Sequence, residues 1–272
     1  MYDGYRDVVL RRLATPRRLG ALLLAALFSV ASYHLGWWQY HRHEAKVARN
    51  DRLDAHYAAA PVPLGTVLTP GRPLPLADDW TRVVVRGRYV GGPVFVRGRP
   101  LDGETGLEVL WALRPDAGGP DVVVDRGWVP PSDAGASVLP RVAAAPSGPV
   151  TVTGWVRRGE ASRGRNLPGG QVASINPAEA GRALGSGSVL PGYVLLQGEA
   201  PAGGGTPPRP RPLGEPDRDI GPHLAYAYQW WLTMVVGFVL VWFGIRRELR
   251  AENPEKYPVK AGRTRIWDEE DE

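Results

Sequence analysis

Residues 19–39 have the sequence LGALLLAALFSVASYHLGWWQ, an apolar run without Asp, Glu, Lys or Arg that directly follows Arg17 and Arg18. At 1.5 Å per residue, a helix over this run spans about 30 Å, which is the thickness of the hydrocarbon core of a bilayer. Trp37 and Trp38 near its end are typical of anchors at the membrane interface. The run therefore predicts a transmembrane helix over residues 19–39.

A cleaved signal peptide is the alternative interpretation of this run. Ser29-Val30-Ala31 has the small-x-small pattern of a cleavage site after a short apolar core. The apolar stretch continues beyond that site through Leu35 and the two tryptophans, and this favours a span.

A second apolar run lies near the other end of the chain. Residues 225–245, AYAYQWWLTMVVGFVLVWFGI, carry no charge and are followed by arginines at 246, 247 and 250. The run predicts a second transmembrane helix over 223–245, and the positive-inside rule places its arginine end in the cytoplasm. The N-terminal residues 1–18 and the tail 246–272, predicted to be disordered at its end, would then both be cytoplasmic. The expected location is the cell membrane, with two spans.

The segment between the spans, residues 40–222, predicts a mainly β (α+β) extracytoplasmic domain, either a small barrel or a sandwich. Up to about Ala59 it is charged and free of Gly and Pro, so the first helix is expected to continue out of the membrane. A short helix is expected after Asn176, a good N-cap, with Glu179 closing a capping box and Gly185 ending it. The Gly/Pro-rich residues 200–221 predict a tether. Strands are expected where short β-branched and aromatic runs lie between turn residues, at 82–89, 93–97, 108–114, 121–129, 150–156, 171–175 and 193–197.

Composition excludes several classes of site. The 272 residues contain no cysteine, which excludes disulfides and Cys-ligated metal centres. The net charge of +5 is dispersed among acids, and no nucleic-acid-binding motif accompanies it, so nucleic acid is not an expected partner. No phosphate-binding loop, dinucleotide fingerprint or catalytic triad is present, and the protein is not expected to be an enzyme.

The histidines gather near the predicted outer ends of the two spans. On a helix, His34, Trp38 and His41 share one face of the first span, and His223 shares a face of the second with two aromatic residues. A polar side chain within a span is costly and suggests function, and an imidazole beside flat aromatic rings suits haem. The alternative is that these residues are ordinary interface residues whose polar atoms reach water or headgroups.

Two segments resemble a known family. Residues 35–46, LGWWQYHRHEAK, match the pattern L-G-x-W-Q-x-x-R-x-x-x-K, and residues 223–231, HLAYAYQWW, match H-L-x-Y-x-x-Q-W. Both patterns are similar to those of the Surfeit-locus family of cytochrome c oxidase assembly proteins. Blocks at 82–89, 126–130 and 152–157 are similar to its soluble domain, in the same order.

This resemblance implies a function in building the haem a centre of aa3-type oxidase. Bacterial members are thought to bind haem a through the histidine that begins the second span, which implies that His223 is an axial ligand of the haem iron. His34 has no position in the pattern, so its role as a second ligand rests on helical geometry alone. The other implied residues of the haem site are Tyr226, Trp230 and Trp38 as walls, and Arg42 and Lys46 as partners of the propionates or, alternatively, of acids and lipid phosphates.

The implied partners are the large oxidase subunit, the haem a synthesis machinery and the lipid bilayer. The alternative function is a scaffold that stabilises an assembly intermediate without touching haem. An enzyme acting on a small ligand is a third interpretation, and it would require a deep pocket lined by paired carboxylates.

Overall fold

The computed structural model describes residues 15–135, 138–165 and 167–252, which form two compact units. The first, the helix pair, contains residues 15–47 and 219–252, and the second, the β domain, contains residues 48–218. Each unit is described by itself.

Two helices, α2 over Pro16–His56 and α4 over His223–Glu252, are long and apolar enough to cross a membrane. As predicted, α2 does not end with the apolar run but continues as a charged helix. Helix α4 likewise extends beyond Ile245 through the arginines that follow it. The predicted disordered end of the tail, residues 253–272, and the N-terminal residues 1–14 lie outside the described residues.

The two helices pack through small side chains. Ala25, Ser29, Ser32 and Gly36 recur every three or four residues along α2 and are buried, although most of their neighbours are exposed. The Ser29 hydroxyl donates to the backbone carbonyl of Met234 at 2.5 Å. Small residues at this spacing allow close approach of helices in an apolar medium, where lipid and side chain are equally hydrophobic. These four residues are called the small-residue seam below.

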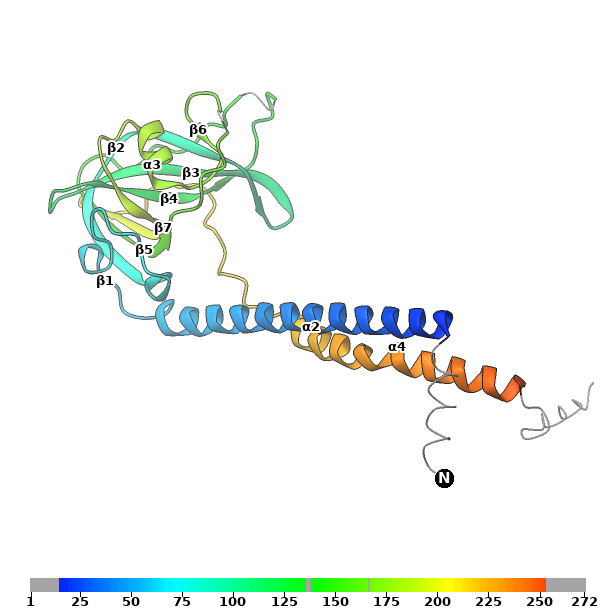
Figure 1. Cartoon of the computed structure of the whole chain (residues 1–272). Helices are drawn as coiled ribbons and strands as arrows, with labels where there is room; N and C mark the ends of the chain where they lie inside the picture. Colours follow the sequence, from blue (N-terminus) through cyan, green and yellow to red (C-terminus); the bar gives the residue numbers. More distant parts are fainter. Residues whose placement is uncertain (1–14, 136–137, 166, 253–272) are drawn as a thin grey trace, which may run out of the picture. The chain divides into compact units, whose positions relative to one another are not determined.

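The β domain is built on one seven-stranded mixed sheet (Figure 1). Strand β2 pairs with β3, β3 with β4, β4 in parallel with β7, β7 with β5, and β5 with β2 again, so the pairings form a closed circuit. The short strands β1 and β6 both pair in parallel with β2. The strands are β1 Val62–Pro63, β2 Arg82–Leu101, β3 Glu104–Pro115, β4 Asp121–Val129, β5 Val150–Arg158, β6 Gln171–Val172 and β7 Val189–Pro201.

The predicted mainly β domain is confirmed, with differences at individual strands. The runs predicted at 82–89 and 93–97 form the single strand β2, which passes through Gly91 and Gly92 with a register shift between Val90 and Val94. A bulge absorbs the glycines without ending the strand. The run predicted at 171–175 pairs over only two residues, and β1, with two 3₁₀ turns at Leu64–Thr66 and Leu76–Asp78, was not predicted.

The short helix α3 covers Pro177–Leu184 and has the predicted ends. The Asn176 side chain accepts from the backbone N–H of Glu179 at 3.2 Å, and Gly185 ends the helix in the left-handed conformation with φ 73°. The predicted capping box is only half formed, because the Glu179 carboxylate accepts from the Ser162 hydroxyl instead.

The predicted tether over 200–221 is partly held to the sheet. Strand β7 runs on to Pro201, and Arg211 forms an antiparallel bridge with Trp128 through backbone hydrogen bonds of 2.8 and 2.9 Å. The isolated bridge satisfies backbone groups of Trp128 on the edge of β4 away from β3, where the pairing with β7 has already ended at Asp125.

The core of the β domain is mainly apolar, and it encloses a buried ion pair. Arg126 and Glu199 have side chains that are 0% and 1% exposed, and the guanidinium donates to both carboxylate oxygens, at 2.5 and 3.2 Å. The Tyr89 hydroxyl donates to the same carboxylate at 2.7 Å, and Arg126 lies over the ring of Trp111. The strand predicted over 121–129 is confirmed as β4, and Arg126 near its end is buried.

Candidate functional site

The start of α4 is joined to α2 by one polar contact within the helix pair. Nδ1 of His223 lies 2.8 Å from Oε1 of Gln39. Because an amide oxygen only accepts, Nδ1 carries the proton in this contact and Nε2 keeps a free lone pair. A histidine held in this way by its other ring nitrogen is oriented as metal-ligating histidines are. Gln39 belongs to the first family pattern and His223 to the second, so the contact joins both.

Lys46 holds the segment that leads into His223. Its ammonium donates to the backbone carbonyl of Asp219 at 3.0 Å, and the Asp219 carboxylate accepts from the N–H of Gly221 at 2.8 Å. A Cβ atom on Gly221 would lie 3.4 Å from Nε2 of His223 and 3.5 Å from Nζ of Lys46. The imidazole and the ammonium therefore lie on the same side of this turn, together with the positive first turn of α4. These residues form a site that favours an anionic group beside a nitrogen ligand.

An aromatic cluster lies next to this polar contact. The ring centroids of Trp37 and Tyr40 are 6.5 and 6.0 Å from that of Trp231, and those of Trp37 and Tyr40 are 5.7 Å apart. The cluster depends on Gly36, because a Cβ atom there would lie 2.3 Å from Nε1 of Trp231. That indole nitrogen is buried and has no hydrogen-bond partner among the described residues. The cluster thus combines flat apolar walls with one unused donor.

The predicted site residues divide between two faces of the helix pair. His223 and Lys46 lie together, as described, and Trp230 is half-buried in α4. Trp38 and Tyr226 are 54% and 45% exposed. The guanidinium carbon of Arg42 lies 5.6 Å from the centroid of the Trp38 ring, so these two side chains stack on each other.

His34 is exposed, and its ring makes an edge contact with Tyr33 at a centroid distance of 5.5 Å. It lies two residues before Gly36, and residues two apart on a helix point to nearly opposite sides. His34 therefore faces away from the small-residue seam, and the structure does not place it beside His223.

His43, unlike His34, lies on the face of α2 that carries Gln39, which it follows by four residues. Its Nδ1 atom is buried without a hydrogen-bond partner in the described part of the chain. Sequence reasoning gave no site role to His43, Gln39 or Trp231. A Gln within a span was the available signal, since polar side chains there are costly.

Gly36→Leu is expected to separate the helices at the aromatic cluster, because no side chain fits between Gly36 and Trp231. The chain has no native cysteine, so an engineered pair can report on the packing. The hydroxyl oxygens of Ser32 and Thr233 lie 3.5 Å apart, one helical turn from Gly36. The double variant Ser32→Cys with Thr233→Cys should therefore form a disulfide when the helices are packed. Adding Gly36→Leu should reduce that disulfide severalfold, as counted by maleimide labelling of free thiols. Gly20→Leu on the same helix, where a Cβ atom meets nothing within 4 Å, should leave it unchanged. Equal disulfide yields in both variants would show that Gly36 does not govern the packing.

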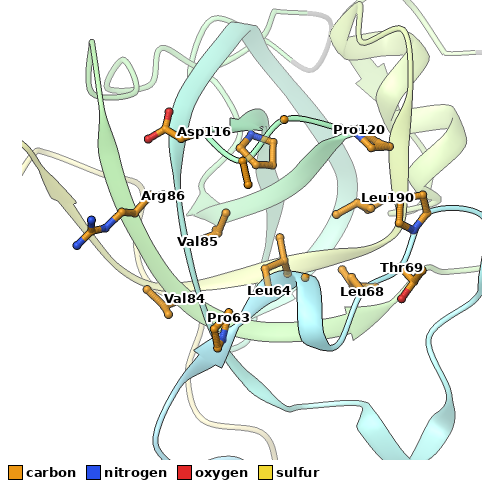
Figure 2. A pocket seen from close by; sticks show the side chains of 16 residues that line it. Pro63, Leu64, Leu68, Thr69, Val84, Val85, Arg86, Asp116, Pro120 and Leu190 are labelled. Carbon is orange, nitrogen blue, oxygen red and sulfur yellow. The ribbon is translucent and has the colours of Figure 1, made fainter.

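The β domain contains a cavity of about 590 Å³ between the 3₁₀ turn after β1 and the β3–β4 turn (Figure 2). Its walls are apolar, with Leu64, Leu68, Val85 and Leu190 around the hollow, and Arg86 points away from it. Asp116 is the single acid among the described lining residues. The cavity thus does not have the paired carboxylates that the third interpretation required.

Paired carboxylates occur elsewhere, in the interior of the β domain. Arg99 lies between Glu108, at 2.8 Å, and Glu160, at 2.7 Å, and buried Asp125 accepts from the N–H of Gly127 at 3.1 Å. Burial raises the pKa of Glu108 to about 7, and burial together with Glu108 raises the pKa of Asp125 well above its ordinary value. Glu108 and Asp125 line none of the larger hollows found among the described residues.

The comparisons with known proteins agree with the two patterns. The model of the SURF1 family matches residues 26–235. An uncharacterised SURF1-like protein of Mycobacterium bovis is 31% identical over 255 residues, which cover 90% of both chains. A SURF1-like protein of Monosiga brevicollis is 28% identical over 89% of this chain and 97% of its own. The cytochrome oxidase assembly protein SHY1 of Saccharomyces cerevisiae is 26% identical over 40% of this chain and 28% of its own.

The family match covers most of α2, the first part of α4 and every strand of the closed sheet, and it includes Gln39 and His223. The resemblance to the Surfeit-locus family is confirmed, and the chain belongs to the SURF1 family.

Proposed function

We propose that this protein is an assembly factor for aa3-type cytochrome c oxidase that binds haem a at the histidine end of the helix pair and delivers it to the large subunit. The name of the yeast relative, a cytochrome oxidase assembly protein, supports the assembly role. The observation that carries the haem proposal is the contact between His223 and Gln39, which joins the two family patterns and leaves Nε2 of His223 available. The partners are the large oxidase subunit and the haem a synthesis machinery.

In this proposal α2 and α4 both cross the cell membrane. Their length and apolar composition support two spans. Exposed Leu, Val and Phe side chains along both helices suit contact with lipid. Arg246 and Arg247 at the end of α4, and Arg17 and Arg18 at the start of α2, favour a cytoplasmic location for both termini.

The site suits the transient binding of a cargo. His223 supplies one nitrogen ligand to the haem iron, and the buried Nδ1 of His43 on the neighbouring face is the second candidate ligand in place of His34. Lys46, beside His223, supplies positive charge for the propionates, and Arg42 would do so only by leaving the ring of Trp38. The aromatic cluster of Trp37, Tyr40 and Trp231 offers flat apolar surface for the ring edge. Imidazole ligands at a half-exposed helix end hold a haem less tightly than an enclosed pocket does, and this suits its later release.

The test is the absorption spectrum of the purified protein in detergent after co-expression with a haem a synthesis pathway. The wild type should carry haem a, and His223→Ala should lose most of the bound haem because the ligand nitrogen is removed. Gln39→Leu should weaken binding by about tenfold, since second-layer partners of a ligating histidine typically contribute 10–100-fold. His34→Ala, a histidine on the opposite face of α2, is the matched control and should retain full haem binding.

The scaffold interpretation predicts a different set of results. The exposed Trp38 and Arg42 pair, stacked on the free face of α2, is the surface that would contact oxidase helices. If the wild type is free of haem yet restores oxidase assembly, and Trp38→Ala abolishes that activity while His223→Ala does not, the haem proposal fails and the scaffold replaces it.

A further inference from the structure

The apolar cavity between the 3₁₀ turn after β1 and the β3–β4 turn has walls that local hydrogen bonds hold in place (Figure 2). In the 3₁₀ turn, the N–H groups of Val67 and Leu68 donate to the carbonyl of Leu64 at 3.0 and 2.9 Å. In the β3–β4 turn, the N–H of Gly118 donates to the carbonyl of Pro115 at 3.1 Å. Prolines among the lining residues restrict the backbone further, namely Pro63, Pro70, Pro115 and Pro120. The cavity is therefore preformed.

The size and the walls of this cavity suit a hydrocarbon. Its volume of about 590 Å³ lies within the range of roughly 300–1,000 Å³ that is typical of small-molecule sites. Leu64, Leu68, Val85 and Leu190 around it are all buried and belong to the largest apolar cluster of the domain. Apolar walls offer water few hydrogen bonds, so such a space gains little from being filled with water. An apolar chain is the ligand that these walls favour.

Two opposite charges stand at one side of the cavity. The N–H of Asp116 donates to the carbonyl of Arg86 at 2.9 Å, so the two side chains start from adjacent points of the backbone. Both residues are exposed, and Figure 2 shows their charged ends directed away from the leucines. Neither side chain forms an ion pair or a hydrogen bond with another residue in the part of the chain that the structure describes. A positive and a negative group are therefore both available at this point.

The same two residues also line a second hollow, of about 420 Å³. Its other walls come from the start of β5 and the end of β7, and they include Thr151 and Ala200. This hollow is more polar than the first. The apolar cavity and the polar hollow thus meet at Arg86 and Asp116. An apolar space that ends in a charged junction matches an amphiphile, which has an apolar chain and a charged head.

We propose that the apolar cavity binds one acyl chain of a zwitterionic phospholipid, with an ethanolamine headgroup at Arg86 and Asp116. The guanidinium pairs with the phosphate of the head, and the carboxylate accepts from its ammonium. An anionic head would place a like charge beside Asp116, and an uncharged chain would use neither residue. A choline head carries no N–H, so it cannot donate to the carboxylate.

The supply of such a lipid follows from the connections of the chain. The β domain continues at residue 47 into α2, and at residue 219 into the segment that leads to α4. This step alone rests on the proposed function, in which both helices cross the membrane. The cavity itself lies entirely within the β domain and involves none of the residues assigned to haem.

The experiment labels the full chain in nanodiscs of phosphatidylcholine with a lysophosphatidylethanolamine that carries a photoactivatable diazirine near the end of its chain. Single-chain lipids exchange through water, so the probe reaches the β domain whatever its position. After irradiation and digestion, mass spectrometry should find the probe on peptides that contain Leu64, Leu68 or Leu190. The corresponding choline probe should label these peptides severalfold less.

One pair of variants tests the place of the chain. Val85→Phe adds a ring to the cavity wall and should reduce labelling of the β domain severalfold. Val138→Phe makes the same change at an exposed valine that does not line the cavity, and it should leave the labelling unchanged.

A second set of variants tests the place of the head and uses exposed residues, so it decides the question even if Val85→Phe does not fold. Arg86→Gln should reduce labelling by the ethanolamine probe about two- to fivefold, because an exposed charge pair contributes little more. Asp116→Asn should remove the preference for ethanolamine over choline. Arg88→Gln changes another exposed arginine of β2, outside both hollows, and should have no effect. Thermal unfolding of each variant establishes that it is folded.

Three results would overturn the proposal. They are an unlabelled β domain, labelling that persists in folded Val85→Phe, and a lysophosphatidylglycerol probe that labels the β domain more strongly than the ethanolamine probe. Labelling of α2 and α4 by the same probes reports on the two spans separately. Loss of the β-domain label alone therefore refutes the lipid site and leaves the proposed function standing.

Discussion

Glu199→Ala is expected to lower the free energy of unfolding of the β domain by about 3–5 kcal/mol. The substitution leaves the guanidinium of Arg126 in the core, 0% exposed, without the carboxylate that accepts two of its hydrogen bonds. The Tyr89 hydroxyl loses its acceptor at the same time. The loss is measured by thermal and urea unfolding of the full chain in detergent, followed by the circular dichroism of the sheet.

The partner variants separate the cost of an unpaired charge from the net contribution of the pair. Arg126→Met combined with Glu199→Leu should cost much less than the sum of the two single changes, since no buried charge remains. Asp54→Ala removes the acid of an exposed pair with Arg218, at 2.5 Å, and should cost less than about 1 kcal/mol. A Glu199→Ala loss as small as that of Asp54→Ala would mean that water reaches Arg126.

The elements that the sequence predicted correctly have local causes. Asn176 and Gly185 set the ends of α3 through their own side chain and backbone, so a short window of sequence is sufficient to place that helix. The β-branched runs at 121–129 and 150–156 alternate with turn residues and become β4 and β5. The parallel strands β1 and β6 are only two residues long, and pairing with a distant part of β2 decides them. The run at 171–175 predicted the position of β6 but not its short length, and no local pattern predicted β1.

The sequence predicts those residues of the candidate haem site that a sequence pattern identifies one by one. His223 and Lys46 are recognisable from the family patterns alone. Gln39 is also a position of the first family pattern, but its contact with His223, 184 residues away in the sequence, depends on how the two helices pack. His34 was placed by helical spacing on one helix, but spacing does not say which face meets the partner helix. The small-residue seam decides that, and His34 lies away from it.

The same limit applies to the buried charges of the β domain. Residues 126–130 predict a strand end, but Arg126 finds Glu199 at a separation of 73 residues. A charged residue in a β-branched run usually faces water, and burial with a partner from another strand is visible only in the folded chain.

The stability of the β domain is expected to fall as pH rises from 5 to 8. Burial, opposed by Arg99 and reinforced by Glu160, raises the pKa of Glu108 from 4.5 to about 7. A carboxyl whose pKa is raised on folding binds its proton more tightly in the folded state. The contribution of Glu108 to the free energy of unfolding is therefore fully present below the pKa of the unfolded state, and it is lost as pH rises through the pKa of the folded state. The difference between 4.5 and about 7 corresponds to roughly 3 kcal/mol of stability.

Glu108→Gln should flatten this dependence, because the amide stays neutral at every pH in the range. The variant should be less stable than wild type at pH 5 and closer to it at pH 8. Glu104→Gln, an exposed carboxylate on the same strand β3, is the matched control and should keep the wild-type profile. Asp125, whose pKa is raised by burial and by Glu108, contributes in the same direction, so Asp125→Asn should remove part of the remaining slope. Stability that rises between pH 5 and 8 would mean that Glu108 stays charged beside Arg99, with the ion pair outweighing burial.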